Sequence, residues 1–402
     1  MLTKRKIKIA HLVSHPIQYF VPLYRALSKR PEIELTVYYY SAASLKEYFD
    51  PGFGRKVAWD IPLTEGYKYI LDQGAEQRNV SEGFAWRPSW STLKDISAKK
   101  YDVVWLHGYM FMNSWLCTMI GQFLNLPVLL RDEQTLLTPR SPVKRLAKRL
   151  ILPRIFKHVC GLYLGKSNRD FFESYGTKRL FPVTYGVDNA SFATHYEQLK
   201  PKRDELRQRF GIANQHPVIL FCGKLIEKKQ PQLLLEAFRR VRQNKECNLL
   251  FAGEGALRDE LETMVRSHSI PDVYFTGFLN QTELPAAYTS ADIFVLPSAY
   301  GETWGLVVNE AMNFHLPIIV SDRVGCAADL VQPKVNGNIF ESGNVESLEN
   351  AVRELVDSPE LRYLYGQKSA EIVRHHDIDT IATQISEACL QVAGNESKSV
   401  EI

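Results

Sequence analysis

The chain has 402 residues, which is too long for one ordinary hydrophobic core and favours two domains. Its hydrophobic content of 45% and charged content of 23% are typical of a globular protein, and no apolar run approaches the roughly 20 residues that span a bilayer. Residues 1–195 carry 28 Lys and Arg against 16 Asp and Glu, whereas residues 196–402 carry 21 against 29. The basic half is therefore expected to meet an acidic partner, and the alternative is an ordinary solvated surface.

The first half alternates short β-rich runs with helical patterns, which predicts a parallel sheet covered on both faces. The expected strands are 6–13, 33–40, 101–107, 127–131, 161–164 and 178–183. The expected helices are 17–28, 112–124, 143–156 and 168–174. We place the end of this first domain, residues 1–195, within the stretch 184–202.

The same alternation restarts after the boundary and predicts a second doubly wound α/β domain over residues 196–375. The expected strands are 217–222, 247–252, 273–275, 293–296 and 318–320, with helices at 231–242, 257–267 and near Trp304. Residues 376–393 form a further helix, and the polar residues 394–402 are expected to be a disordered tail.

The densest motif follows the apolar run Ile293–Leu296, where a Pro/Ser/Gly loop leads into a helix whose first turn is expected to contain Trp304-Gly305-Leu306. Free backbone N–H groups at such a helix start bind anions or hydroxyl oxygens. Glu302 precedes this helix and Glu310 lies about two turns inside it, so the two carboxylates could hold a polyol at two places. The alternative is a loop carboxylate and a solvent-facing helix residue.

A glycine and two lysines follow the first strand of the second domain. Gly223 permits close backbone approach, and Lys224 and Lys229 can reach a phosphate. Positive charge at this place would offset the negative charge that develops on a nucleoside diphosphate leaving group. Taken alone, the segment is an ordinary basic surface loop.

The order Gly223-Lys224…Lys229, Glu302-x7-Glu310, Val324-Gly325-Cys326-Ala327-Ala328-Asp329 and Asn336-Gly337-Asn338 resembles family 4 of the glycosyltransferases. These are retaining enzymes of the GT-B fold, in which two doubly wound Rossmann-like domains face a central cleft. The resemblance implies an acceptor-binding first domain, a second domain that binds a nucleotide-sugar, and a C-terminal helix, 376–393, that crosses back to the first domain.

The resemblance also implies roles for individual residues. Lys224 and Lys229, beside Gly223, would contact the diphosphate, and Glu310 would hold the ribose. Glu302 would hold sugar hydroxyls, together with the backbone N–H groups of Thr303, Trp304, Gly305 and Leu306. Phe278 would line the base, and His107 would lie near the transferred sugar. The expected catalytic residues are therefore Glu302, His107 and Lys229.

Two N-terminal features bear on the acceptor. The loop Ser14-His15-Pro16-Ile17-Gln18-Tyr19-Phe20 resembles a branch of family 4 that builds bacterial surface polysaccharides, and His15 and Gln18 are acceptor or cleft candidates. Residues 142–158 combine Lys144, Arg145, Lys148 and Arg149 with an apolar face. This segment is either an amphipathic helix on anionic lipid or a surface helix whose apolar face packs inward.

The expected function is retaining transfer of a sugar from a nucleotide-sugar donor to a hydroxyl of a glycan or lipid-linked saccharide acceptor. The expected location is the cytoplasm, with peripheral attachment to the inner membrane face. We expect no cofactor, no metal and no nucleic-acid partner. The alternatives are a nucleotide-sugar epimerase of the same fold and a non-catalytic sugar-nucleotide-binding protein.

Overall fold

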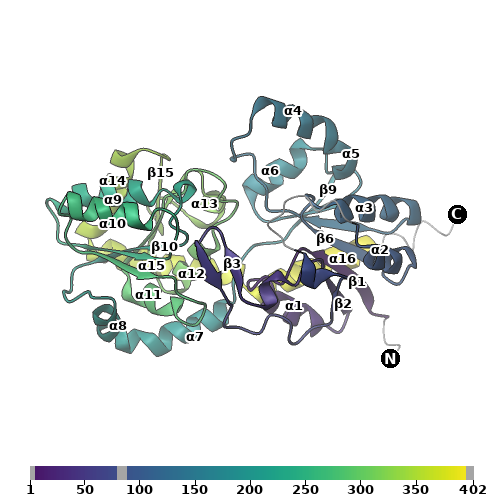
Figure 1. The fold of residues 1–402 in the computed structure, drawn as a ribbon, viewed down its shortest axis with the longest axis horizontal. Coiled ribbons are helices and arrows are strands. Elements are labelled where there is room, and N and C mark those ends of the chain that lie inside the picture. Colours follow the sequence, from purple (N-terminus) through teal and green to yellow (C-terminus); the bar gives the residue numbers. More distant parts are fainter. Residues whose placement is uncertain (1–4, 79–87, 395–402) are drawn as a thin grey trace. The chain divides into compact units, whose positions relative to one another are not determined.

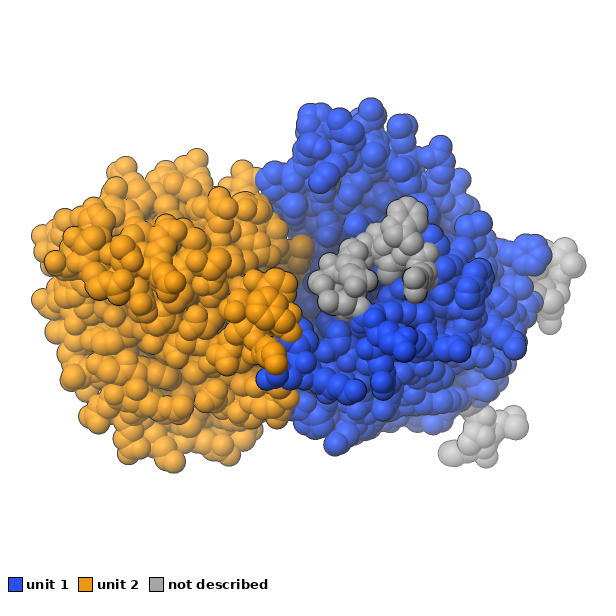
Figure 2. Space-filling view, in the orientation of Figure 1, with its two compact units in different colours: residues 1–48, 61–185, 378–402 blue, residues 49–60, 186–377 orange. Residues whose placement is uncertain are grey.

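A computed structural model of the chain describes residues 5–78 and 88–394. The chain divides into two compact units, coloured separately in Figure 2. The first unit comprises residues 1–48, 61–185 and 378–402, and the second comprises residues 49–60 and 186–377. Residues 395–402 of the expected tail lie outside the described part.

The sheet of the first unit has seven strands, and each strand pairs in parallel with its neighbours. Their order across the sheet is β5 (Tyr69–Leu71), β2 (Ile33–Tyr39), β1 (Ile7–Val13), β6 (Val103–His107), β7 (Val128–Arg131), β8 (Cys160–Tyr163) and β9 (Arg179–Pro182).

Helices cover both faces of this sheet (Figure 1). One face carries α1 (Val21–Ser28) and α16 (Ile378–Gly394), which contact each other extensively. The other face packs Leu12, Val104 and Leu130 of the strands against helices α2 (Trp90–Ser97), α3 (Met112–Leu124), α5 (Pro153–Phe156) and α6 (Lys166–Ser174). The unit also contains α4 (Pro142–Ile151).

The sheet of the second unit has six strands, again all parallel. Their order is β12 (Val273–Gly277), β11 (Asn248–Ala252), β10 (Val218–Cys222), β13 (Ile293–Leu296), β14 (Ile318–Ser321) and β15 (Gly337–Phe340). This is the doubly wound order in which the direction of winding reverses beside the first strand. Here the reversal lies between β10 and β13.

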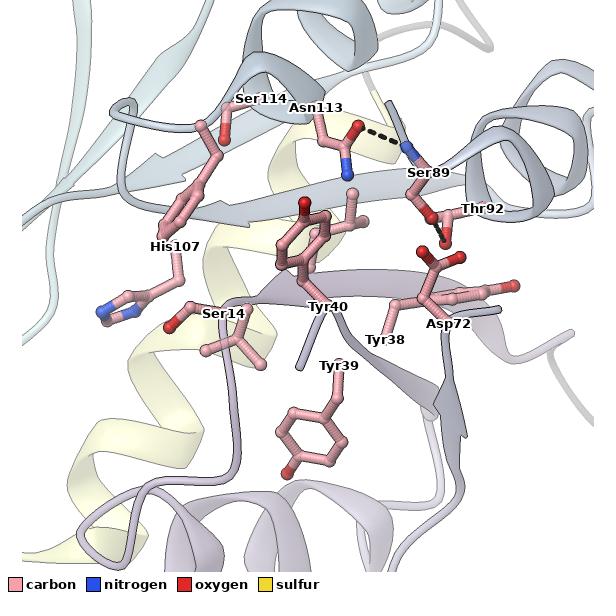
Figure 3. Close-up of a pocket in the computed structure, with 13 residues that line it drawn as sticks. Ser14, Tyr38, Tyr39, Tyr40, Asp72, Ser89, Thr92, His107, Asn113 and Ser114 are labelled. Carbon is pink, nitrogen blue, oxygen red and sulfur yellow. Dashed lines mark hydrogen bonds between the residues drawn. The ribbon is translucent and has the colours of Figure 1, made fainter. Parts of the chain in front are cut away.

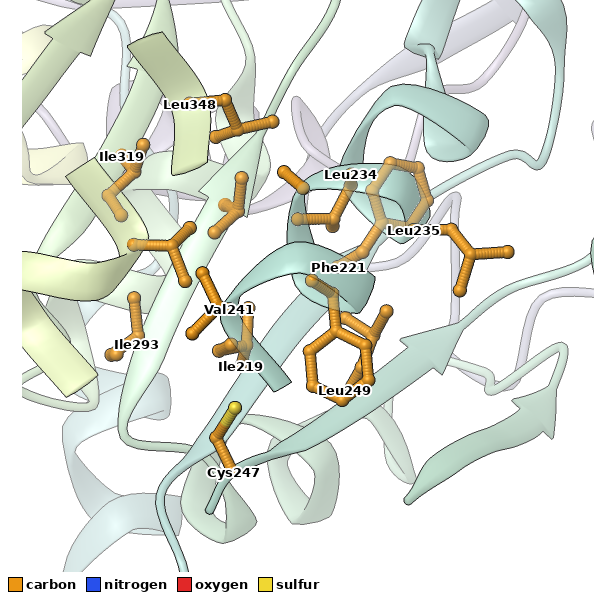
Figure 4. Close-up of a cluster of buried hydrophobic side chains, with 14 of the residues drawn as sticks. Ile219, Phe221, Leu234, Leu235, Val241, Cys247, Leu249, Ile293, Ile319 and Leu348 are labelled. Atoms are coloured by element: carbon orange, nitrogen blue, oxygen red, sulfur yellow. The ribbon is translucent and has the colours of Figure 1, made fainter. Parts of the chain in front are cut away.

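The core of the second unit explains why its strands are continuous apolar runs. Residues of β10 and β11 pack against Leu234 and Val241 of α9 and Leu348 of α14 (Figure 4). Strands that helices cover on both faces have no polar side. The helices are α7 (Asn189–Leu199), α8 (Arg203–Arg209), α9 (Pro231–Arg242), α10 (Arg258–Ser267), α11 (Leu284–Ser290), α12 (Leu306–Asn313), α13 (Ala327–Leu330), α14 (Val345–Asp357) and α15 (Pro359–Val373).

The expected α/β class with two doubly wound Rossmann-like units is confirmed. Three details differ from the sequence-based expectations. The N-terminal part of the first unit ends at Tyr185, where a boundary at 195 was expected, because α7 contacts α11 and α12 of the second unit. The expected helix 143–156 is two helices, since Pro153 begins a new one. Residues 49–60 belong to the second unit, and this segment includes most of the small two-stranded sheet of β3 (Tyr48–Asp50) and β4 (Arg55–Val57).

Candidate active site

The two motifs follow β10 and β13, the strands at which the winding reverses. Gly223 comes directly after β10, and Glu302 lies in the loop after β13. Both loops therefore leave the sheet at its carboxyl edge, at the point where doubly wound sheets bind ligands. The strand order thus brings together residues that are far apart in sequence.

Lys229 and Glu302 form an ion pair that joins these two loops. Their side chains are only 13% and 14% exposed. The hydroxyl of Ser298 also donates to Glu302 Oε2, at 3.1 Å. Burial raises the pKa of Glu302, but the charge and hydrogen bond of Lys229 outweigh burial and hold this pKa below its ordinary value of 4.5. Glu302 is therefore a carboxylate at neutral pH.

Gly223 and Lys224 form the entrance to the first loop. Gly223 has φ +142°, a conformation that favours glycine, and its N–H donates to the carbonyl of Ala252 at 3.0 Å. The ammonium of Lys224 donates to both carboxylate oxygens of Asp50, at 2.7 and 2.9 Å. Asp50 was not among the residues that the sequence pattern singled out. Such short charged hydrogen bonds hold the lysine in one place.

The helix after the second motif begins later than expected. Gly305 has φ +101° and α12 begins at Leu306, so Trp304 and Gly305 precede the helix. Their assignment to its first turn is wrong, because a left-handed residue cannot continue a right-handed helix. Gly325 packs closely against the segment before the helix. A Cβ on Gly325 would lie 1.9 Å from the carbonyl oxygen of Thr303, so a larger residue does not fit at this position.

Two residues predicted to contact the donor, Trp304 through its backbone N–H and Glu310 through its carboxylate, have buried side chains. The Trp304 side chain is 2% exposed, and its indole N–H donates to Asn309 Oδ1 at 2.9 Å. Glu310 is the fifth residue of α12, about one turn in, and it is completely buried. The hydroxyl of Tyr288 donates to Glu310 Oε2 at 2.6 Å. These contacts fix the two side chains firmly within the second unit.

Phe278 follows β12 and lies beside the segment 49–60. Its ring is 4.9 Å from that of Phe53 in an edge-on arrangement, and the guanidinium of Arg55 lies 5.1 Å from the centre of the ring. Aromatic pairs and cation–π contacts of this kind each contribute about 0.5–1.5 kcal/mol. The predicted base-lining residue is thus partly covered by the chain itself.

His107 is the last residue of β6, at the carboxyl edge of the first unit's sheet. Its ring packs edge-on against Phe20 at 4.8 Å, and its Nε2 lies 3.8 Å from Glu133 Oε1. Burial lowers the pKa of His107 well below 6.5, and the charge of Arg131 lowers it further. His107 is therefore neutral at physiological pH and can donate or accept one hydrogen bond per nitrogen.

The loop after β1 carries His15 and Gln18, both half-buried. His15 Nδ1 lies 2.9 Å from the hydroxyl of Ser14, and burial lowers the pKa of His15 to about 4. The turn is held by Ser44, whose hydroxyl donates to the carbonyl of Pro16 at 2.5 Å. This loop lies at the same sheet edge as His107, since β1 and β6 are parallel neighbours.

A small cavity of about 30 Å³ opens beside His107 and Ser14 (Figure 3). It is also lined by Tyr40, Asp72 and Asn113, which the sequence pattern did not single out. A cavity of this size admits one or two water molecules. Asp72 belongs to a stretch without clear periodicity, and Asn113 lies at the start of α3. Only the tertiary structure brings these two residues to the carboxyl edge of the sheet.

The basic helix α4 is almost wholly exposed. Val143, Leu146 and Leu150 are 78%, 60% and 59% exposed, so its apolar face does not pack inward. Among its basic residues, Lys148 turns toward the unit and donates to the hydroxyl of Tyr109. The other basic side chains, Lys144, Arg145 and Arg149, are exposed.

Neither a membrane span nor a metal cluster occurs in the described residues. No helix within residues 5–78 and 88–394 is long and apolar enough to cross a bilayer. Within the same ranges, no three or more His, Cys, Asp or Glu side chains gather in a way that could hold a metal ion.

Comparison with known proteins identifies the domain to which these loops belong. Residues 202–371 match the family described as Glycosyl transferases group 1. Over these residues the chain is similar to a glycosyltransferase domain. The matched range contains both lysines, both glutamates and Phe278. The range covers less than half of the chain and lies within the second unit.

Curated relatives match part of the chain. The chain is 29% identical over 173 residues to alpha-D-kanosaminyltransferase of Streptomyces kanamyceticus, a match that covers 42% of this chain and 44% of that protein. It is 31% identical over 204 residues to sulfoquinovosyl transferase SQD2 of Arabidopsis thaliana, covering 50% of this chain and 38% of that protein. The chain thus spans about half, or less, of the length of these two relatives.

Similarity to solved structures extends over both units. Alr3699/HepE of Anabaena, solved in complex with UDP, aligns with a TM-score of 0.74 and 16% identity over 96% of this chain and 100% of that chain. At this level of identity the similarity shows the fold alone. The glycosyltransferase domain therefore belongs to a chain with the two Rossmann-like domains of the GT-B fold.

Proposed function

We propose that this protein is a retaining glycosyltransferase that moves a sugar from a nucleotide-sugar donor to a hydroxyl of a glycan or lipid-linked saccharide. The observation that carries this proposal is the Lys229–Glu302 pair at the switch point of the second unit's sheet. It combines a cation for a diphosphate with a carboxylate for sugar hydroxyls, inside a glycosyltransferase domain. We further propose a role in surface polysaccharide biosynthesis, on the resemblance of the His15–Gln18 loop.

The donor is proposed to bind at the carboxyl edge of the second unit's sheet. Lys224 and Lys229 lie on one loop after β10, within reach of two phosphates of a nucleoside diphosphate. Gly223 lets the backbone approach the phosphates closely. Glu310 and Phe278 are the proposed contacts of ribose and base, and binding would then require Tyr288 and Phe53 to yield part of their present contacts.

The proposed reaction exchanges one bond at the anomeric carbon for another. The bond from this carbon to the phosphate oxygen breaks, and the acceptor oxygen forms a new bond on the same face. The proton of the acceptor hydroxyl passes to an oxygen of the departing diphosphate. Lys224 and Lys229 would stabilise the charge that develops on this diphosphate, and neutral His107 is proposed to hydrogen-bond the transferred sugar.

The first unit is proposed to bind the acceptor, with His15 and Gln18 as contacts. Its exposed helix α4 supports a proposal of peripheral attachment to an anionic membrane. Val143, Leu146 and Leu150 would enter the interface, while Lys144, Arg145 and Arg149 would meet lipid phosphates. Each basic side chain near such a surface contributes about 1 kcal/mol. No metal or other cofactor is proposed, since lysines provide the positive charge.

Thermal shift with UDP-, GDP- and dTDP-sugars tests the donor, followed by transfer assays with lipid-linked oligosaccharides. We expect one class of donor to raise the melting temperature and to lose its sugar only when an acceptor is present. Conversion of the donor to a second sugar without any acceptor would instead show an epimerase.

Flotation with liposomes tests membrane attachment. Wild-type protein is expected to float with phosphatidylglycerol vesicles and not with phosphatidylcholine vesicles. A variant with Lys144, Arg145 and Arg149 changed to Glu should stay at the bottom of the gradient. Equal flotation of this variant and the wild type would refute the proposed attachment.

A further inference from the structure

Residues 49–60 are the part of the N-terminal half that packs with the second unit. In sequence they lie between β2 and β5 of the first unit, and they carry β4 and most of β3 (Figure 1). The C-terminal end of this segment is held by hydrogen bonds from two residues that follow β12. The amide of Asn280 donates to the carbonyl of Ala58 at 2.8 Å, and the hydroxyl of Thr282 donates to Asp60 at 2.5 Å. We call residues 49–60 the strap.

The other end of the strap, at Asp50, contacts Lys224 in the loop after β10. The carboxylate of Asp50 accepts from the Lys224 ammonium at 2.7 and 2.9 Å. Its Oδ1 also accepts from the backbone N–H groups of Gly52 and Phe53, at 2.8 and 3.1 Å, so its orientation is fixed within the strap. Gly52 suits this approach, because a Cβ on it would lie 2.6 Å from Lys224 Cδ. Only a residue without a side chain leaves the lysine its present position.

The middle of the strap covers the residue proposed to line the base. Phe53 packs edge-on against Phe278, with Lys224 Nζ 4.6 Å from the centre of the Phe53 ring. Arg55 lies over the Phe278 ring. The strap thus contacts both Lys224, which is proposed to bind phosphate, and Phe278, which is proposed to line the base.

A phosphate oxygen and a carboxylate oxygen make the same kind of contact with an ammonium group, at the same distances. Asp50 therefore takes a place on Lys224 that a donor phosphate would take. A phosphate brought to Lys224 beside the Asp50 carboxylate would meet a like charge within a few ångströms, which disfavours both anions together. The diphosphate and Asp50 cannot both bind Lys224 at full strength.

We propose that Asp50 is an internal anion that competes with the donor diphosphate for Lys224, so that the strap sets nucleotide affinity and loosens when the nucleotide binds. This inference rests on the proposed function, because it names a group that controls the proposed donor site. The strap carries the competing charge on a carboxylate whose orientation is held by its own backbone.

Isothermal titration with UDP, GDP and dTDP tests the competition in the full chain. The variant Asp50→Asn keeps an oxygen for the turn and removes the charge. It is expected to bind the preferred nucleotide about two- to fivefold more tightly than wild type, the range for loss of one partly exposed charge interaction. Combined with Lys224→Met, the same substitution should have no such effect, since the shared partner is gone.

Asp272→Asn is the matched control. Asp272 also pairs with a basic residue, Arg242, at 2.8 Å, but it precedes β12 and so lies at the opposite edge of the sheet. Its loss should leave nucleotide affinity unchanged. Thermal melting of each variant establishes that it is folded.

Hydrogen exchange gives a second measurement on the wild-type protein. The amides of Gly52 and Phe53 should exchange faster when UDP, GDP or dTDP is bound. Equal or weaker nucleotide binding by Asp50→Asn would overturn the inference and leave the proposed donor site intact, because Asp50 would then position Lys224 for the phosphate. Absence of nucleotide binding by wild type and variant alike would overturn the proposed function, and the inference with it.

Discussion

Replacing Lys229 with Met removes the cation from a largely buried ion pair of the candidate site. Glu302 would keep one described hydrogen bond, from Ser298, and would lose its charged partner. Breaking a fully buried pair costs about 3–5 kcal/mol, whereas an exposed pair contributes at most about 1 kcal/mol. The side chains of this pair are 13% and 14% exposed, so the free energy lost should be nearer the value for a buried pair. We expect the variant to lose about 2–3 kcal/mol of unfolding free energy.

The stability change also has a predicted pH dependence. The folded pKa of Glu302 is below its ordinary value of 4.5, so the stabilisation from the pair is complete above that value and is lost as the pH falls through the folded pKa. The gap in unfolding free energy between wild type and Lys229→Met should therefore narrow as the pH falls below 4.5. Near neutral pH, a loss of 2–3 kcal/mol lowers the melting temperature of a unit of this size by about 5–10 °C.

Catalysis should suffer more than stability. Loss of a charged group that stabilises the leaving diphosphate costs about 10²–10³ in kcat. Melting and steady-state kinetics of Lys229→Met, Glu302→Gln and the double variant separate the two effects. Lys228→Met is the comparison variant: Lys228 forms no ion pair within the described residues and lowers the pKa of Glu302 only through its charge, so its loss should have a smaller effect than that of Lys229. Wild-type melting and turnover in Lys229→Met would show that this ion pair neither stabilises the fold nor takes part in the reaction.

Three further predictions concern other parts of the chain. Tyr288→Phe removes the hydrogen bond to buried Glu310 and should lower the unfolding free energy by about 2 kcal/mol, which denaturant titration checks. Burial raises the pKa of Asp132 to about 7, so the folded state retains a proton that the unfolded state loses above about pH 4. The contribution of Asp132 to the unfolding free energy should therefore fall as the pH rises from about 4 to 7, by up to about 1.4 kcal/mol per pH unit. Asp132→Asn should make stability less dependent on pH in melts across that range. Leu146→Glu on exposed α4 should change stability by less than about 0.5 kcal/mol yet reduce vesicle flotation, and a large drop in melting temperature would show that this side chain is packed.

Local pattern was sufficient for much of the fold. The helices 112–124 and 231–242 and the strand 293–296 have the predicted bounds, because each combines an uninterrupted period with a clear start or stop. The winding order of the second sheet then brings the Gly223 and Glu302 loops together, which the alternation of strands and helices already indicated. The position of Lys229 and Glu302 at one sheet edge follows from this order.

Other features depend on contacts that no local pattern reveals. Asp50 lies 174 positions before Lys224, on a strand of three residues with no periodicity. The start of α12 was misplaced because Gly305 is as compatible with a helix start as with the left-handed turn it makes. The exposed apolar face of α4 has the same sequence pattern as a face that packs inward, so only the structure distinguishes the two.

We propose that the second unit holds a nucleotide-sugar whose sugar is transferred with retention. Proton NMR of the complete reaction, with the donor found by thermal shift and an accepted saccharide, follows both the new bond and its configuration. We expect one new glycosidic bond for each nucleoside diphosphate released, with the anomeric configuration of the donor preserved. Release of the diphosphate without a new glycosidic bond, or a product of inverted configuration, would contradict this proposal.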